Sequence, residues 1–319
     1  MTIEAKIVAH SRHPMFENEN CGPVPDIITY LLRYPRFIHA EVMTHRLFSR
    51  NASSSRAIPV KRVIEDVLRD PAMPIHWGKN QRGMQADGEH DAAVHLQDGD
   101  YVATAKQAWL FARDRAVEVA QAFETAGYHK QVVNRLIEPF THINVVVTAT
   151  NYANFFWLRR HPDAQPEIKA LADAMWDALQ ASTPRVLQPG EWHMPFVTDE
   201  DRDRVELVYG GNGNVLEIPV GVADLIKVSV ARAARTSYLT HDGRVPDFDE
   251  DVALYDRLVG SAPLHASPAE HQARADEPLF TSPNTTAWEN AHLAGNFDPG
   301  WVQYRKTLPG ERCDIYEAA

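Results

Sequence analysis

The sequence predicts an α+β fold in which helices dominate. Residues 101–126 carry apolar side chains at the spacing of an amphipathic helix, and the glycine at position 127 supplies a stop signal. Residues 143–150 are rich in β-branched side chains, which favour a strand. A chain of 319 residues can form one large domain or two modest ones, and we expect a single domain over residues 1–319.

In the N-terminal half we expect a short strand at residues 3–9 and a short helix at 26–33 that ends before a proline. Residues 37–48 fit a helix or a strand, because their periodicity does not decide between the two. Apolar side chains at helical spacing predict a helix at 61–69. Residues 71–100 are polar and rich in Gly, Asp, Gln and His, so we expect a long loop or an insertion.

In the C-terminal half, Pro166 suits the first turn of a helix whose apolar residues follow at helical spacing. Residues 210–214 predict a turn, and they lack the G-x-G-x-x-G spacing of a phosphate-binding loop. Residues 272–300 are expected to be rich in loops. Further helices are expected at 132–137, 220–235 and 249–259.

The composition argues against several classes of protein. The formal net charge of −11 makes non-specific nucleic-acid binding an improbable main role. No apolar run approaches the ~20 residues that span a bilayer, and the N-terminus lacks the layout of a signal peptide. We therefore expect a cytoplasmic protein, of a bacterium or a phage-infected host, with no membrane and no direct nucleic-acid partner.

The cysteines and histidines do not predict a thiolate or a metal site. Cys21 and Cys313 give no disulfide framework, and neither has an activating partner in the sequence. The 15 histidines do not form H-E-x-x-H or a comparable ligand set. We expect neither a cysteine nucleophile nor a bound metal.

Residues 44–56 form the segment with the most chemistry. They contain one histidine, three arginines, four serines and one asparagine, and an apolar stretch leads into them. Guanidinium groups, hydroxyls and backbone N–H groups together can bind a phosphate or an electron-rich ring. The chemistry alone fits two interpretations, an anion-binding site and a solvated polar loop.

This segment, T-H-R-L-F-S-R-N-A-S-S-S-R-A over residues 44–57, resembles the signature of flavin-dependent thymidylate synthases, R-H-R-x-x-S-x-N-E-x-S-x-R-Y. The sequence departs from that signature at Thr44, Ala52 and Ala57, which replace Arg, Glu and Tyr. The matching positions are His45, Arg46, Ser49, Asn51, Ser54 and Arg56.

Two further stretches resemble the same family. Residues 134–139, N-R-L-I-E-P, resemble A-R-x-x-L-P, and residues 154–168 resemble N-F-L-x-L-R followed, after four residues, by A-Q-x-E-I. The resemblance implies that Arg135 holds the nucleotide and that Arg159 polarises the uracil ring.

A third pair of motifs lies in a different order. The family carries A-A-R-x-S-F and H-x-x-P-F-E-H upstream of the signature, whereas here A-A-R-T-S-Y at 233–238 and H-A-S-P-A-E-H at 265–271 lie near the C-terminus. We therefore expect a divergent, circularly permuted, phage-type relative, with residues 220–272 as the permuted segment. Permutation is tolerated where the original termini are close and exposed.

The resemblance implies transfer of a one-carbon unit from methylenetetrahydrofolate to C5 of dUMP, with FAD as cofactor and NADPH as reductant. Arg159 would be catalytic, and the family's homotetramer is expected because arginines from separate segments must meet at one ligand. The resemblance assigns FAD binding to His45, Arg46, Asn154, Ser237 and His271. It assigns nucleotide binding to Glu41, Ser54, Ser55, Arg56, Arg135 and Arg159.

The departures from the signature keep other functions open. Loss of Arg at Thr44 and of Glu at Ala52, with Glu41 where a Gln is usual, changes the charge of the expected pocket. A dUMP or dCMP hydroxymethylase for modified phage DNA, in which water captures the transferred carbon, is one alternative. A non-catalytic nucleotide-binding relative is another, and a metal-dependent hydrolase is a third and weaker one.

Overall fold

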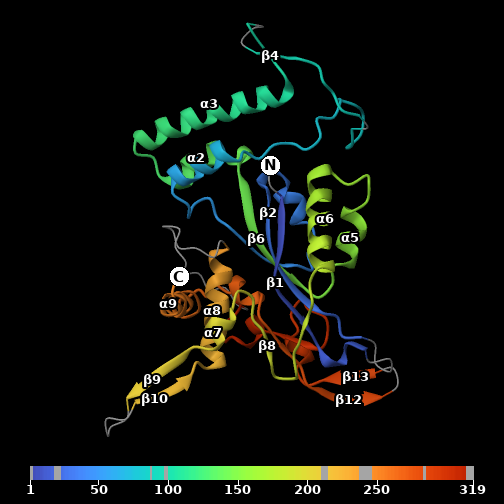
Figure 1. Cartoon of the computed structure of the whole chain (residues 1–319), viewed down its shortest axis with the longest axis vertical. Helices are drawn as coiled ribbons and strands as arrows, with labels where there is room; N and C mark the ends of the chain where they lie inside the picture. Colours follow the sequence, from blue (N-terminus) through green and yellow to red (C-terminus); the bar gives the residue numbers. More distant parts are fainter. Residues whose placement is uncertain are drawn as a thin grey trace.

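The computed structural model describes residues 3–17, 23–86, 88–96, 100–209, 215–236, 246–282 and 285–313. It confirms a mixed fold of helices and strands. A five-stranded sheet in the order β3-β6-β2-β1-β7 forms its centre (Figure 1). Neighbours are antiparallel except β1 and β7, which are parallel. The strands are β1 (Glu4–Arg12), β2 (Ile27–Pro35), β3 (Ser49–Ala52), β6 (His142–Ala149) and β7 (Arg185–Val186).

The expected helix at 26–33 is wrong, because these residues form strand β2. β2 lies between β1 and β6, and Tyr30, Leu32 and Tyr34 on it are almost wholly buried. Four consecutive residues, 27–30, are buried, so both faces of β2 are covered and it lacks the alternation that identifies a strand in sequence. The expected strands at 3–9 and 143–150 are confirmed as β1 and β6.

Helices cover the sheet and extend beyond one end of it. α5 (Ala153–Arg159) and α6 (Pro166–Gln180) pack beside it, with Ile168, Leu171 and Met175 in the main core (Figure 1). α2 (Val60–Arg69), α3 (Ala105–Thr125) and α4 (Lys130–Val133) form a second core. α3 begins later than expected, because the Thr104 side chain and Gln107 form a capping box.

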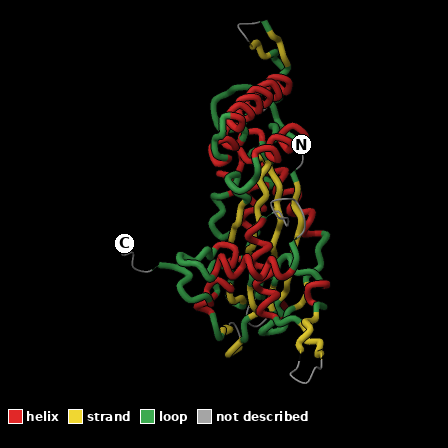
Figure 2. The backbone as a smooth tube through the Cα atoms, turned by 90° about the vertical axis from the view of Figure 1, so that its left-hand side faces the viewer, coloured by secondary structure: helices red, strands yellow, loops and turns green. Residues whose placement is uncertain are grey.

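Residues 71–96 are mostly irregular, as expected, apart from β4 (Val94–Leu96), which pairs with β5 (Tyr101–Ala103). The strands run along the long axis of the molecule, between two groups of helices (Figure 2). Within the described ranges, every helix is too short or too polar to cross a membrane.

The C-terminal third forms the other end of the molecule. The expected helices at 220–235 and 249–259 are confirmed as α8 (Val222–Arg235) and α9 (Phe248–Val259), whereas the expected turn at 210–214 lies outside the described residues. Residues 272–300 contain more strand than expected. The remaining elements are α7 (Asp199–Arg202), β8 (Trp192–His193), β9 (Val205–Tyr209), β10 (Val215–Pro219), β11 (Ala273–Ala275), β12 (Pro278–Ser282), β13 (Thr285–Trp288) and β14 (Trp301–Gln303).

Candidate functional site

The segment rich in arginine and serine begins just after strand β2. Two short helices, η2 (Arg36–Ile38) and α1 (His39–Val42), carry the chain away from the sheet, so residues 37–42 are helical. Ile38, Val42 and Phe48 are buried and anchor this turn on the core. Most side chains between these anchors, including Glu41 and Arg46, are therefore exposed, and His45 is half-buried.

Arg159 and His45 meet at the start of β3. Arg159 Nε donates to His45 Nε2 at 2.9 Å, and its Nη2 donates to Thr44 Oγ1 at 3.3 Å. Burial, then the charges of Arg159 and Arg50, lower the pKa of His45 to about 4. His45 is therefore neutral at physiological pH and accepts a hydrogen bond without cancelling the charge of Arg159. We call Thr44, His45 and Arg159 the Arg159 group.

Among the described residues, the arginines of this region lack acidic partners. In the described part of the chain, no carboxylate forms an ion pair with Arg46, Arg50, Arg56 or Arg159. Arg50 instead donates to the carbonyl oxygens of Met43 and His45. Uncompensated cations in a chain of net charge −11 are the arrangement expected of an anion-binding site.

A second set of predicted residues lies beyond the other end of β3. Ser55 Oγ donates to Glu138 Oε1 at 2.6 Å, and Arg135 Nη1 lies 3.4 Å from Glu138 Oε2. Ser54 and Arg56 are exposed, and the Arg56 amide donates to Ser54 Oγ at 3.3 Å. We call Ser54, Ser55, Arg56 and Arg135 the Ser-Arg group.

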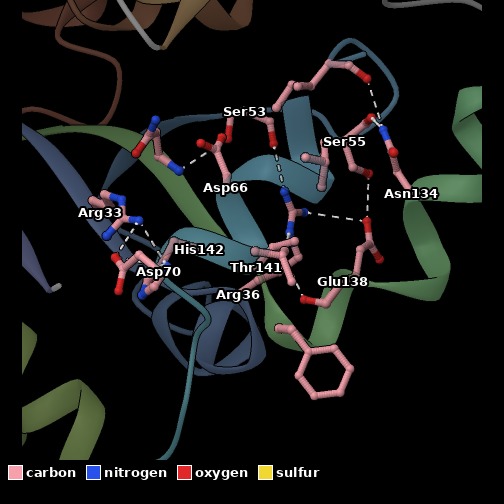
Figure 3. A pocket seen from close by; sticks show the side chains of 15 residues that line it. Arg33, Arg36, Ser53, Ser55, Asp66, Asp70, Asn134, Glu138, Thr141 and His142 are labelled. Carbon is pink, nitrogen blue, oxygen red and sulfur yellow. Dashed lines mark hydrogen bonds and ion pairs between the residues drawn. The ribbon is translucent and has the colours of Figure 1, made fainter. Parts of the chain in front are cut away.

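A cavity of about 100 Å³ has Ser55 of this group among its lining residues (Figure 3). Arg36 enters it and donates to Thr141 Oγ1 at 3.2 Å, with the Glu138 carboxylate 3.8 Å away. Asn134 donates to the carbonyl oxygens of Ser55 and Ile58, which holds the loop. Its Oδ1 is buried without a hydrogen-bond partner among the described residues.

His142 is a second lining residue with an unused polar atom. Arg33, which can only donate, contacts Nδ1 of His142 at 3.1 Å, so the proton of the neutral ring lies on Nε2. Burial, then the charge of Arg33, lowers the pKa of His142 to about 4. Nε2 is buried and, within the described ranges, unpaired. Asn134 and His142 thus leave one acceptor and one donor unused, among the described residues, beside the cavity.

Sequence reasoning missed the polar lining of this cavity. Asn134 and Glu138 occupy the positions of Ala and Leu in the A-R-x-x-L-P motif, and both contact the segment rich in serine. The sequence signal for this polar lining was that both positions are apolar in the motif and polar in this chain. Arg36 and His142 gave no such signal, because each belongs to no motif.

The predicted site residues form two groups rather than one. The Arg159 group and the Ser-Arg group lie at opposite ends of β3, whose four residues span about 13 Å at 3.3 Å per residue. One chain alone therefore does not bring Arg159 and Arg56 onto a single small ligand. Asn154 is exposed on α5, the helix that also carries Arg159.

The C-terminal segment packs directly on the same strand. Asn51 Nδ2 donates to the Ala233 carbonyl at 2.7 Å. His271 Nδ1 lies 2.8 Å from Thr148 Oγ1, and Thr148 is paired with Ser49 across β6 and β3. His271 is fully buried, and its Nε2 has no partner in the described structure. Ser237 lies outside the described residues, as does Cys21.

Comparison with known proteins identifies a family and finds solved structures to which the chain is similar. The family model described as "Thymidylate synthase complementing protein" matches residues 26–185. The UMP/dUMP methylase PolB from Streptomyces cacaoi, bound with 5-Br dUMP, is 20% identical, with 56% of this chain and 90% of that chain covered and a TM-score of 0.39. Its structure with 5-Br UMP gives 20% identity, 56% and 88% coverage and a TM-score of 0.37. No curated protein matches the chain.

Proposed function

Because this chain belongs to the thymidylate synthase complementing protein family, we propose that it transfers a one-carbon unit to C5 of a pyrimidine nucleotide, with dUMP as substrate and dTMP as product. The observation that carries the proposal is the charge of Arg159. Its guanidinium group is hydrogen-bonded to a neutral imidazole and a hydroxyl, so its positive charge is available to a ligand.

Arg159 would act on the pyrimidine ring. C5 of uracil becomes nucleophilic only when negative charge builds on the ring carbonyl oxygens, and a positioned guanidinium group stabilises that charge. The hydrogen bonds from Arg159 to His45 and Thr44 fix the plane of the guanidinium before a substrate binds.

The Ser-Arg group would hold the nucleotide phosphate. Ser54 and Arg56 are exposed, Ser55 and Glu138 stabilise the loop that carries them, and Arg135 lies beside it. Since β3 separates this group from Arg159, we propose that each site combines the Arg159 group of one subunit with the Ser-Arg group of another. Glu41, exposed on α1, would contact the same nucleotide. A homotetramer provides such interfaces.

Unused polar atoms among the residues expected to hold FAD support that cofactor. His271 Nε2 is a buried polar atom without a partner among the described residues, and Arg46 and Asn154 are exposed for a ligand. His45, Arg46, Asn154, Ser237 and His271 would hold FAD, with NADPH and methylenetetrahydrofolate as co-substrates. Reduced FAD would supply the hydride that completes the methyl group.

We also propose that residues 220–272 are the permuted segment. The contacts of Asn51 with Ala233 and of Thr148 with His271 support this, because they join one C-terminal motif to the signature strand β3 and the other to its neighbour β6. A reordered chain with residues 220–272 moved to the N-terminus, through linkers long enough to span the new junctions, should fold and keep the product of the natural chain. Failure to fold with several linker lengths would count against the permutation.

A hydroxymethylase acting on dUMP or dCMP is the second candidate. Thr44 favours it, because its hydroxyl accepts from Arg159 where an arginine would have repelled it, and the site has lost one positive charge. Water, rather than hydride, would then capture the transferred carbon.

Product mass tests these proposals. The purified protein is incubated with dUMP or dCMP, methylenetetrahydrofolate, NADPH and FAD, and the nucleotides are analysed by mass spectrometry. A methylated product supports the thymidylate synthase activity, and a hydroxymethylated product supports the second candidate. Absence of any modified nucleotide, in a preparation that binds dUMP, would indicate a non-catalytic relative. Light scattering reports the proposed tetramer.

A further inference from the structure

A chain of buried hydrogen bonds joins strand β8 to the central sheet. His193 on β8 contacts Ser11 Oγ through Nδ1 at 2.9 Å and Thr29 Oγ1 through Nε2 at 2.8 Å. Thr29 and Thr148 are joined at 2.7 Å, and Thr148 contacts His271 Nδ1 at 2.8 Å. Each of the five residues is at most 5% exposed, so water does not compete for these bonds.

The chain can be hydrogen-bonded in two directions. Burial lowers the pKa of both His193 and His271 to about 3, so each ring is neutral and carries one N–H and one acceptor nitrogen. In one direction His271 Nδ1–H donates to Thr148, Thr148 to Thr29 and Thr29 to His193 Nε2, which leaves the proton of His193 on Nδ1. In the other direction every bond is reversed, and both rings carry the proton on Nε2.

We propose that Thr148, Thr29 and His193 are positioning residues that force His271 into the same tautomer as His193, and so decide whether His271 Nε2 donates or accepts. Each threonine hydroxyl has a single hydrogen to donate, so a change at one ring must pass through both threonines to the other. If the two rings had opposite tautomers, one of the three contacts between them would have two hydrogens or none. Such a contact in the buried core costs free energy, because a polar group is left without a hydrogen bond.

Of the two histidines in this hydrogen-bond chain, only His271 has a ring nitrogen without a partner among the described residues. Its Nε2 is buried and unpaired among the described residues, whereas both nitrogens of His193 are bonded. The neighbouring Glu270 carbonyl accepts from Gln303 Nε2, which also contacts Ser49 on β3. His271 therefore lies against the signature strand, where the proposed function places FAD.

The identity of the ligand sets the expected direction. This step rests on the proposed function, because it takes FAD as the group that meets His271. Phosphate and carbonyl oxygens, which accept hydrogen bonds, dominate the polar surface of FAD. Binding should thus select the direction in which both histidines carry the proton on Nε2.

The test is nitrogen-15 NMR in the solid state on the full chain labelled at histidine, with and without FAD. Protonated and unprotonated ring nitrogens have distinct shifts, and the His193→Gln and His271→Gln variants assign the signals. We expect the same tautomer at both rings in the free protein and Nε2–H at both with FAD. Opposite tautomers at the two rings, in either state, would overturn the inference.

Two variants separate a positioning role from simple structural support. Ser11→Ala removes the acceptor of His193 Nδ1–H, so it should fix both rings as Nε2–H without FAD and leave FAD affinity equal or higher. Thr148→Val breaks the chain and should weaken FAD binding by about three- to tenfold, the usual range for one hydrogen bond. Thr150→Val, which removes a buried hydroxyl bonded to Asp298 outside the chain, is the matched control.

These outcomes are distinct from failure of the proposed function. If the natural protein binds no FAD, the proposed cofactor is wrong, yet the equality of the two tautomers in the free protein still tests the chain. If Ser11→Ala leaves His271 with its proton on Nδ1, or lowers FAD affinity as much as Thr148→Val, the residues are structural and the inference fails.

Discussion

Two arginines in this chain, Arg232 and Arg159, differ in the groups that their guanidinium groups contact. Arg232 on α8 is 5% exposed and donates to both Asp201 and Asp251, which come from α7 and α9, and to the Phe196 carbonyl. Arg159 is half-buried and donates to a neutral histidine and a hydroxyl. Two carboxylates compensate the positive charge of Arg232, whereas no carboxylate among the described residues compensates that of Arg159.

The difference supports the proposal that Arg159, rather than Arg232, serves a ligand. Burial alone would raise the pKa of Asp201, but hydrogen bonds from Arg232 and Thr198 outweigh it and lower the pKa. The Arg232 cluster is therefore a closed ionic network that joins three helices. The Arg159 group has no such closure, since an acidic partner would compete with an anionic substrate for the guanidinium group.

The largest expected effect is on stability at the closed cluster. Arg232→Met would leave Asp201 without its main partner and weaken the pairing of buried Asp251, which also contacts Arg235. The free energy of unfolding should fall by about 3–5 kcal/mol, as for other broken buried ion pairs. Urea denaturation measures it. Arg204→Met, which removes an exposed pair with Asp249, is the control and should change stability by less than about 1 kcal/mol.

The next effect is on catalysis at the open group. Arg159→Met should lower the rate of product formation by about 100- to 1000-fold, as when a transition-state hydrogen-bond donor is removed. Its stability should change by no more than about 0.5 kcal/mol, because Arg159 lies near the surface. Arg160→Met, at the residue that follows α5, is the matched control, since Arg160 pairs with Asp173 and lies over Trp176. Equal rate losses in both variants would show that charge compensation does not separate the two classes.

The sequence could predict the open group better than the closed one. His45 and Arg159 belong to motifs whose residue types and spacing are unusual, so the sequence predicts each of them as a site residue. It does not predict the hydrogen bond between them. Arg232, Asp201 and Asp251 are ordinary residues on separate helices, and their convergence depends on tertiary packing that no local pattern encodes. The same limit hid Arg36 and His142, which line one cavity only because β2 and β6 are neighbours.

Strand β2 shows the limit for secondary structure. A short apolar run is compatible with a buried helix or a buried strand, and the choice depends on the neighbours it finds. The confirmed helices α2, α6 and α9 have the longer amphipathic pattern that a single solvent-facing side produces. The position of residues 220–272 relative to β3 followed from the motif resemblance rather than from periodicity.

A smaller effect compares two arginines within the Ser-Arg group. Arg56 has no acidic partner in the described ranges, whereas Arg135 lies 3.4 Å from Glu138. Arg56→Ala should weaken dUMP binding by about tenfold, or ~1.4 kcal/mol, and Arg135→Ala by about threefold. Isothermal titration calorimetry at one fixed salt concentration measures both constants. A larger loss for Arg135 would reverse the order that charge compensation predicts.

The smallest effect tests why Arg159 keeps its charge. The pKa of His45 is lowered from 6.5 to about 4, so the unfolded chain binds a proton at this residue before the folded protein does. The contribution of neutral His45 to stability is thus complete above pH 6.5 and is lost as the pH falls through 4.

His45→Gln keeps a hydrogen-bond acceptor for Arg159 but does not titrate. Its stability should decline less steeply than that of the natural protein between pH 6.5 and 4. The difference should stay below about 1 kcal/mol per pH unit, because His45 is partly exposed and solvent screens the interaction. Urea denaturation across this range measures both slopes. Parallel slopes would mean that His45 gains its proton as readily in the folded protein as in the unfolded chain. Two positive charges would then face each other at the site, and Arg159 would not be held ready for an anion by a neutral partner.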